Sequence, residues 1–259
     1  MSDAESLRSN DGSSEGAAYY ASPGFIRSPR RREWWSVLHP PYTLLHLSLV
    51  VLGGCLRAPV NYGYLAVSIV AFFLGLGVGA HSLDELHGRP LGTTIPRRQL
   101  WGAAIVGLGG AVALGVVGVF LVSRYLIVFM VIGLVIAIGY NLEIGHGRLH
   151  TSGVLVVGWG SFPIVTSYFA QHRTISAAAV ALAGFGALLV LLQRTLSTPA
   201  RLLRRRTAHV EARLLLRDGT DLELTKATLL APLETSLRIL CWSGPVLALS
   251  MLLVRLAEA

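Results

Sequence analysis

The chain has few charged residues, only two cysteines and a single lysine among its 259 residues. Charged residues make up 14% of the sequence, against roughly 25% in an average soluble domain, and hydrophobic residues make up 53%. Cys55 and Cys241 both lie in apolar runs, which excludes a disulfide framework and a cysteine-ligated zinc site. The scarcity of charge excludes an ordinary soluble domain and predicts a protein that crosses a membrane several times.

The net charge of +8 comes almost entirely from arginine. Such a charge can indicate a nucleic-acid binder, but its meaning depends on where the basic residues lie. Here they are distributed among the loops between apolar segments, so we expect membrane lipids and no nucleic acid as partners. The sequence identifies no protein partner.

Seven apolar stretches are each able to cover about 30 Å of hydrocarbon. They lie near residues 41–57, 61–83, 100–123, 125–141, 153–171, 175–196 and 229–254. The fold predicted from them is all-α, a polytopic helical membrane bundle of about seven transmembrane helices.

The basic residues predict the orientation of the bundle. If the N-terminus is cytosolic, 17 of the basic residues fall in cytosolic segments and four fall on the opposite side. Cytosolic loops carry such an excess of arginine and lysine. We therefore expect a multi-pass plasma-membrane protein with its N-terminus in the cytosol, its C-terminus outside and its functional site on the cytosolic face.

The predicted organisation has four parts. Residues 1–36 are a disordered cytosolic tail ending in a membrane anchor of arginines and tryptophans, and residues 37–201 hold helices 1–6. Residues 202–228 form a cytosolic insert, and residues 229–259 contain the last helix and the C-terminus.

The insert has two possible structures. Two runs with partial alternation flank Asp218-Gly219, a turn dipeptide typical of a β-hairpin, but an amphipathic surface helix over about 200–216 also fits. Pro199 is expected to end the sixth helix, and Glu234 is expected to pair with Arg238 one turn later.

The densest group of ionisable residues lies in GVGAHSLDELHGRPLGTTIPRRQLW, residues 77–101. On a helix, His81, Asp84 and Glu85 share one face, and His87 follows. Carboxylates at this position could hold Mg²⁺, whereas a set that includes histidine would favour a transition metal. Three arginines follow whose guanidinium groups are suited to bind phosphate: Arg89, Arg97 and Arg98. The alternative is a solvated helix end with ordinary membrane-flanking arginines.

A second polar group lies between the fourth and fifth stretches and comprises Tyr140, Asn141, Glu143, His146, Arg148 and His150. Glu143 and His146 have the Glu-x-x-His spacing of di-metal sites, but Gly145 and Gly147 argue against the regular helix that such sites use. Two other interpretations are a loop, interrupted by glycines, that closes over a polar ligand, and a polar loop that only connects two helices. At the end of the sixth helix, Arg194 and Arg201 could contact an anionic group, or they flank the membrane without further function.

With these residues in view, the chain resembles the UbiA superfamily of intramembrane prenyltransferases. GRPLGTTIPRRQL (88–100) is similar to the Arg-Pro-Leu loop between helices 2 and 3 of that family. Tyr140-Asn141, followed by a basic loop and GVLVVGWGSFPIV (153–165), is similar to the segment that opens helix 5, and LHPPYT (38–43) lies where the family has Arg-Pro. The resemblance covers roughly residues 36–200.

The resemblance implies a UbiA-like arrangement of helices and two Asp-rich motifs that hold Mg²⁺ against a prenyl diphosphate. Here the first motif is HSLDELH (81–87), and the second is replaced by QRTLSTPAR (193–201), which has no carboxylate. The expected metal ligands are Asp84, Glu85 and Glu143.

The leading functional hypothesis is an enzyme that transfers a prenyl group from its diphosphate or cyclises it. Asp84 and Glu85 would hold the metal, and His81 or His87 would act as ligand or base. The substrate would be bound by Arg89, Arg98, Tyr140, Asn141, Arg148 and Arg194.

Two alternatives remain open. One is a transition-metal membrane enzyme that uses His81, Glu85, Glu143 and His146. The other is a non-catalytic lipid-binding or partner protein on the same fold, which the missing carboxylates of the second motif favour.

Overall fold

A computed structural model describes residues 26–259 of the chain. The part of the predicted N-terminal tail at 1–25 lies outside the described residues. The helices in chain order are α1 (Pro29–Leu38), α2 (Pro40–Cys55), α3 (Tyr62–Phe72), η2 (Phe73–Ala80), α4 (His81–Leu86), α5 (Arg97–Leu121), α6 (Leu126–Asn141), α7 (Ser152–Leu155), η3 (Val156–Ser161), α8 (Phe162–His172), α9 (Ala177–Arg206) and α10 (Lys226–Ala257). Two short strands, β1 (Ala212–Leu215) and β2 (Asp221–Leu224), lie between α9 and α10.

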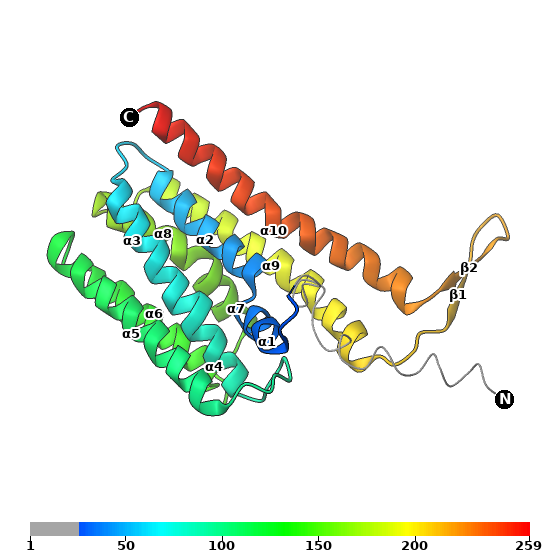
Figure 1. The fold of residues 1–259 in the computed structure, drawn as a ribbon. Coiled ribbons are helices and arrows are strands. Elements are labelled where there is room, and N and C mark those ends of the chain that lie inside the picture. The colour runs from blue at the N-terminus through cyan, green and yellow to red at the C-terminus, as the bar shows by residue number, and fades with distance from the viewer. Residues whose placement is uncertain (1–25) are drawn as a thin grey trace.

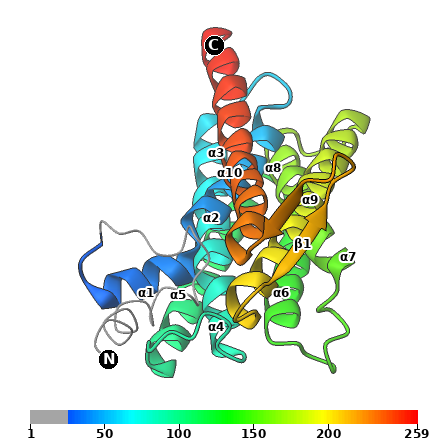
Figure 2. The same cartoon turned by 90° about the vertical axis from the view of Figure 1, so that its right-hand side faces the viewer.

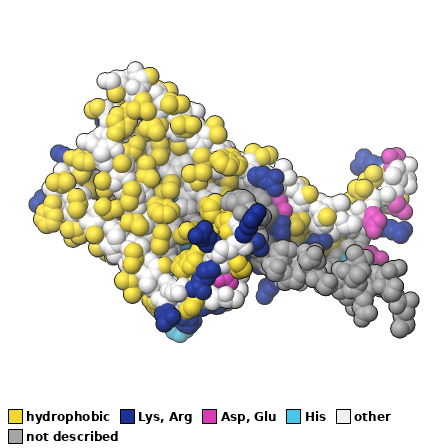
Figure 3. Space-filling model, in the orientation of Figure 1, with side chains coloured by type: hydrophobic (Ala, Val, Ile, Leu, Met, Phe, Trp, Pro, Cys, Tyr) yellow, Lys and Arg dark blue, Asp and Glu magenta, His cyan; other side chains and the backbone are white. Residues whose placement is uncertain are grey.

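The structure is an all-α bundle with six helices long and apolar enough to cross a membrane. These are Pro29–Cys55, Tyr62–Leu86, Arg97–Leu121, Ser152–His172, Ala177–Arg206 and Lys226–Ala257. Helix α6 is as apolar but shorter, since its 16 residues reach only about 24 Å at 1.5 Å per residue. On the face drawn in Figure 3, hydrophobic side chains cover the bundle, whereas most charged side chains gather at one end and on the hairpin. Such a surface suits a hydrocarbon environment, so the chain is an integral membrane protein.

The two ends of the bundle differ in character (Figures 1 and 2). Helix α1, the loop 87–96, the loop 142–151 and the end of α9 meet at one end, which we call the basic end. Glu33 of α1 accepts hydrogen bonds from Thr94, and Arg205 of α9 donates to the Pro90 carbonyl. At the opposite end Arg255, near the C-terminus, donates to the carbonyl of Cys55. The loops therefore alternate between the ends in the order that the basic residues predict.

Helix α1 corrects the prediction of a disordered tail up to residue 36. It turns into α2 at His39, which has the left-handed φ of 44°. Trp34 packs beside the buried cluster that includes Ile95 and Leu100, and Glu33 accepts from both the N–H and the hydroxyl of Thr94. The anchor is thus a folded helix that docks on the loop 87–96.

Helix α9 corrects two further predictions. It passes through Pro199 and ends at Arg206, so Pro199 does not end the helix and no surface helix extends to 216. Proline deprives only the carbonyl four residues earlier of its intrahelical donor. Glu234 accepts from Arg204 of α9, a partner that the sequence did not indicate.

The insert forms the hairpin that Asp218-Gly219 indicates. Strands β1 and β2 pair antiparallel, with Arg213 opposite Glu223. The Thr220 N–H donates to the Asp218 carboxylate at 2.9 Å and lowers the pKa of Asp218. The hairpin projects away from the basic end of the bundle (Figure 1).

The Arg204–Glu234 ion pair ties the end of α9 to the start of α10. The two side chains are only 22% and 16% exposed, so water screens the pair weakly. Breaking it leaves a half-buried charge without its partner.

We therefore expect Arg204→Ala and Glu234→Ala each to destabilise the protein by about 1–3 kcal/mol. The double variant should cost less than the sum of the two, with a coupling energy of about 0.5–3 kcal/mol, measured by thermal unfolding in detergent. Arg213→Ala and Glu223→Ala on the exposed hairpin provide the control cycle. Strict additivity at 204 and 234 would contradict the pairing.

Candidate functional site

His81 turns toward α2 and away from the carboxylates that follow it. Its Nδ1 lies 3.2 Å from the Gly77 carbonyl, and its ring centroid is 5.1 Å from that of His39. The buried His46 also lies close enough to interact electrostatically with His81. His81 thus belongs to a histidine group with His39 and His46.

Asp84 lies among positive groups. The charges of Arg201 and Arg205 from α9, and of His150 from the loop 142–151, are close enough to interact with its carboxylate. Next to them, the Arg194 guanidinium and the Asp84 carboxylate both lie close enough to the phenol of Tyr140 to interact with it electrostatically. We call these six residues the polar centre: Asp84, Tyr140, His150, Arg194, Arg201 and Arg205.

Glu85 lies close enough to Asp84 for the two carboxylates to interact, but it has hydrogen-bond partners of its own. Its side chain is 1% exposed, and both of its oxygens are used. Oε2 accepts from Leu91 N–H at 3.0 Å, while Oε1 accepts from the N–H and the hydroxyl of Thr93 at 3.0 and 2.8 Å. Glu85 thus holds the loop 87–96 in place from beneath.

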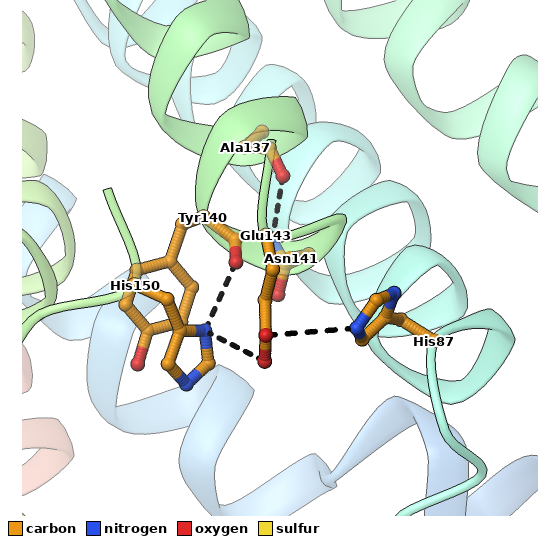
Figure 4. Close-up of polar contacts among 6 residues, drawn as sticks. All are labelled: His87, Ala137, Tyr140, Asn141, Glu143 and His150. Atoms are coloured by element: carbon orange, nitrogen blue, oxygen red, sulfur yellow. Dashed lines mark hydrogen bonds and ion pairs between the residues drawn. The ribbon is translucent and has the colours of Figure 1, made fainter. Parts of the chain in front are cut away.

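Glu143 lies between two histidines from different segments (Figure 4). Its carboxylate is 3.7 Å from His87 Nε2 and 3.7 Å from His150 Nδ1. His150 Nδ1 also lies 3.0 Å from the Tyr140 carbonyl, and the His150 ring stacks on the Tyr140 ring at 4.3 Å. Glu143 therefore connects the end of α4 to the loop 142–151, at the exposed rim of the polar centre.

The other predicted site residues are dispersed over the basic end. The Asn141 amide points back along its own helix and donates to the Ala137 carbonyl. Arg89 has a left-handed φ of 53° and donates to Thr93. Arg98 lies in the first turn of α5, and His146 and Arg148 lie in the loop 142–151, all three exposed.

The predicted metal sets are not assembled. Within residues 26–259, no three histidine, cysteine, aspartate or glutamate side chains are placed to share one ion. Asp84 interacts with the arginines of α9, Glu85 binds the loop amides and Glu143 lies between two histidines, while His81 faces α2 and His146 is exposed on its loop. Glu85 would have to release the loop amides before it could bind Mg²⁺, so these residues do not fit a two-sided carboxylate site.

A long apolar cavity of about 220 Å³ runs between α3–η2, α5, α6 and η3–α8. Near the basic end its wall includes Ala80, Ala137 and Trp159, and at the other end it reaches the exposed Leu121. The Trp159 ring lies 4.9 Å from the Tyr140 ring. Trp159, which forms part of the cavity wall, therefore packs directly against a residue of the polar centre.

Two π-helical segments, η2 and η3, help to shape this junction. Segment η2 ends at Ala80 directly before His81, and η3 carries Trp159. Such segments interrupt regular helices and recur at functional sites. Here they set the faces that α4 and Trp159 present to the cavity and to the polar centre.

Two residues were not predicted from the sequence: Arg205 of the polar centre and Trp159 in the wall of the apolar cavity. Trp159 lies in the GWGS run of an otherwise apolar segment, which was a usable signal for a special position. Arg205 is one of three consecutive arginines, 204–206, and the sequence does not show which one turns inward.

No family model, no curated protein and no solved structure matches this chain. The resemblance to the UbiA superfamily therefore rests on the motifs in the sequence alone.

Proposed function

We propose that the chain is a UbiA-like membrane protein with seven spans, α6 being the short one. The excess of arginine supports a basic end that faces the cytosol, with the C-terminus outside. A 16-residue helix can still cross where the bilayer thins locally around it.

We propose further that it binds an isoprenoid diphosphate. The apolar cavity would take the prenyl chain, and Arg194, Arg201 and Arg205 would hold the diphosphate beside Asp84. The observation that carries the proposal is the contact between the Trp159 and Tyr140 rings, because it places a wall of the apolar cavity against a phenol that lies close to Arg194. Arginine suits this task since its planar fork pairs with phosphate oxygens in bidentate fashion.

The chemistry supported by this arrangement is loss of the diphosphate, followed by transfer or cyclisation of the prenyl group. The arginines would stabilise the negative charge that develops on the departing diphosphate. The apolar cavity would keep water from the resulting carbocation. In this proposal the arginines neutralise the diphosphate, because Glu85 is committed to the loop and Glu143 to the two histidines.

A second candidate is a non-catalytic protein that binds the same lipid. It is favoured by a specific observation. Asp84 is close to Arg201 and Arg205, but the end of α9 contributes no carboxylate of its own. Release of inorganic diphosphate separates the two candidates, since only an enzyme produces it.

The experiment is a titration of the purified protein with geranylgeranyl diphosphate and with geranylgeraniol, which lacks the phosphates. We expect tighter binding of the diphosphate, and we expect this preference to persist in chelator, unlike binding that depends on Mg²⁺. Arg194→Ala should weaken binding of the diphosphate by about 1.5–3 kcal/mol, or roughly 10–150-fold, and leave binding of the alcohol unchanged.

Arg124→Ala is the matched control, because it removes an arginine from the opposite end of the bundle. Equal binding of the alcohol and the diphosphate would refute an arginine-held head group. A strict requirement for Mg²⁺ would instead favour the metal site that the sequence resemblance implies.

A further inference from the structure

A second basic pocket adjoins the polar centre, with which it shares Arg205, and lies between the loop 87–96 and the end of α9. It has a volume of about 470 Å³ and is lined by residues 89–92 and 204–208. Its charged members are Arg89, Arg204, Arg205 and Arg206, and none of its lining residues is acidic. We call it the arginine pocket.

The walls of this pocket are held in place by specific bonds. Glu85, which is buried, binds the amides of Leu91 and Thr93 and thereby fixes the loop on one side. Arg205 donates to the Pro90 carbonyl at 2.7 Å and ties the loop to α9. The pocket is therefore a built feature of the basic end and not a chance gap between mobile arginines.

Two of the four guanidiniums are committed to the walls in this way, since Arg204 binds Glu234 and Arg205 binds the loop. Arg206 is exposed. Arg89 donates to the carbonyl and the hydroxyl of Thr93 through Nη1. Arg89 and Arg206 thus have donors that can turn to a ligand. Glu234 offsets the charge of Arg204, whereas Arg89, Arg205 and Arg206 repel one another around the hollow, and a bound anion would relieve that repulsion.

We propose that the arginine pocket binds a phosphate monoester through Arg89 and Arg206, which are not members of the diphosphate site in the polar centre. A phosphate monoester fits because it carries nearly two negative charges and several acceptor oxygens, which match guanidinium forks. The pocket lies at the basic end of the bundle, so the phosphate can come from an anionic lipid head group or from solution.

The test uses the full-length protein in detergent, titrated with dioctanoyl phosphatidic acid, with dioctanoyl phosphatidylcholine and with inorganic phosphate. We expect phosphatidic acid to bind more tightly than phosphatidylcholine. The double variant R89Q/R206Q should weaken binding of phosphatidic acid about tenfold or more, which is the scale of one lost charge-assisted hydrogen bond. Geranylgeranyl diphosphate binding should stay at its original affinity, which distinguishes this pocket from the polar centre.

The matched control is R148Q/R217Q, which removes the same charge from two exposed arginines outside the pocket. Displacement of phosphatidic acid by millimolar phosphate would assign the pocket to phosphate itself, and lack of displacement would assign it to a lipid head group. The proposal is overturned if the control variant weakens binding as much as R89Q/R206Q, or if phosphatidic acid binds no better than phosphatidylcholine. Size-exclusion elution of each variant at the wild-type volume verifies that the fold is retained.

Discussion

Gly186→Ala is expected to lower the midpoint of thermal unfolding strongly, whereas Gly184→Ala on the same helix should not lower it at all. A Cβ at position 186 would lie 2.5 Å from the carbonyl oxygen of Gly160 and 2.6 Å from Cδ1 of Ile164. A Cβ at position 160 would meet the Gly186 carbonyl oxygen at the same 2.5 Å. Since the obstructing atom is backbone on both sides, α9 and η3 must move apart to admit a methyl group.

The expected cost is large because helices in a membrane are held together by close packing and not by exclusion of water. Overpacking costs about 1–3 kcal/mol, and a backbone clash belongs at the upper end of that range. For a chain of this size, 3 kcal/mol corresponds to a fall of roughly 6–12 °C in the unfolding midpoint.

Gly184 provides a matched control two residues away in α9. A Cβ at 184 would meet nothing within 4 Å, and alanine favours a helix over glycine by about 0.5–1 kcal/mol. Thermal unfolding in detergent, followed by circular dichroism, compares the two variants directly. Equal midpoints for Gly184→Ala and Gly186→Ala would mean that α9 and η3 do not approach each other as closely as described.

The sequence was sufficient for the helices but not for the way they meet. Apolar runs located the spans from 41 onward, and Asp218-Gly219 located the hairpin, because both signals are local. Gly184 and Gly186 have the same local sequence environment, and only the partner across the interface distinguishes them. Pro199 was misjudged as the end of its helix because a breaker residue acts locally, whereas packing along the rest of α9 sustains the helix.

The site was predicted by region and not by residue. The end of the second apolar run and the loop after the fourth were both identified, and they do meet at the basic end. Asp84 and Glu85 differ by one position, which is 100° on a helix, so their neighbours are set by the tertiary fold. The amides of Leu91 and Thr93 determine the role of Glu85, and the arginines of α9 determine the surroundings of Asp84.

Glu85→Gln is expected to release the loop 87–96 from the bundle. The carboxylate accepts three hydrogen bonds through two oxygens, and an amide in its place would turn a donor toward one of the backbone N–H groups. Hydrogen bonds to a charged acceptor contribute about 1.5–3 kcal/mol each, so a loss of about 3 kcal/mol is a conservative expectation. In hydrogen exchange, the amides of Leu91 and Thr93 should then open roughly 100-fold more often than in the wild type.

Glu143→Gln is the control, because Glu143 also carries a carboxylate at the basic end but is 43% exposed and lies 3.7 Å from its histidine partners. Exposed pairs of this kind contribute about 0–1 kcal/mol, so exchange at Leu91 and Thr93 should remain at the wild-type rate. The comparison also tests the metal-binding role that the sequence resemblance implies for Glu85. If Glu85 were a ligand for Mg²⁺, added Mg²⁺ would slow exchange of the loop amides in the wild type. Without Mg²⁺, the amides of Glu85→Gln would then exchange at the same rate as those of the wild type. Fast exchange in Glu85→Gln that is indifferent to Mg²⁺ would instead assign the carboxylate to the loop.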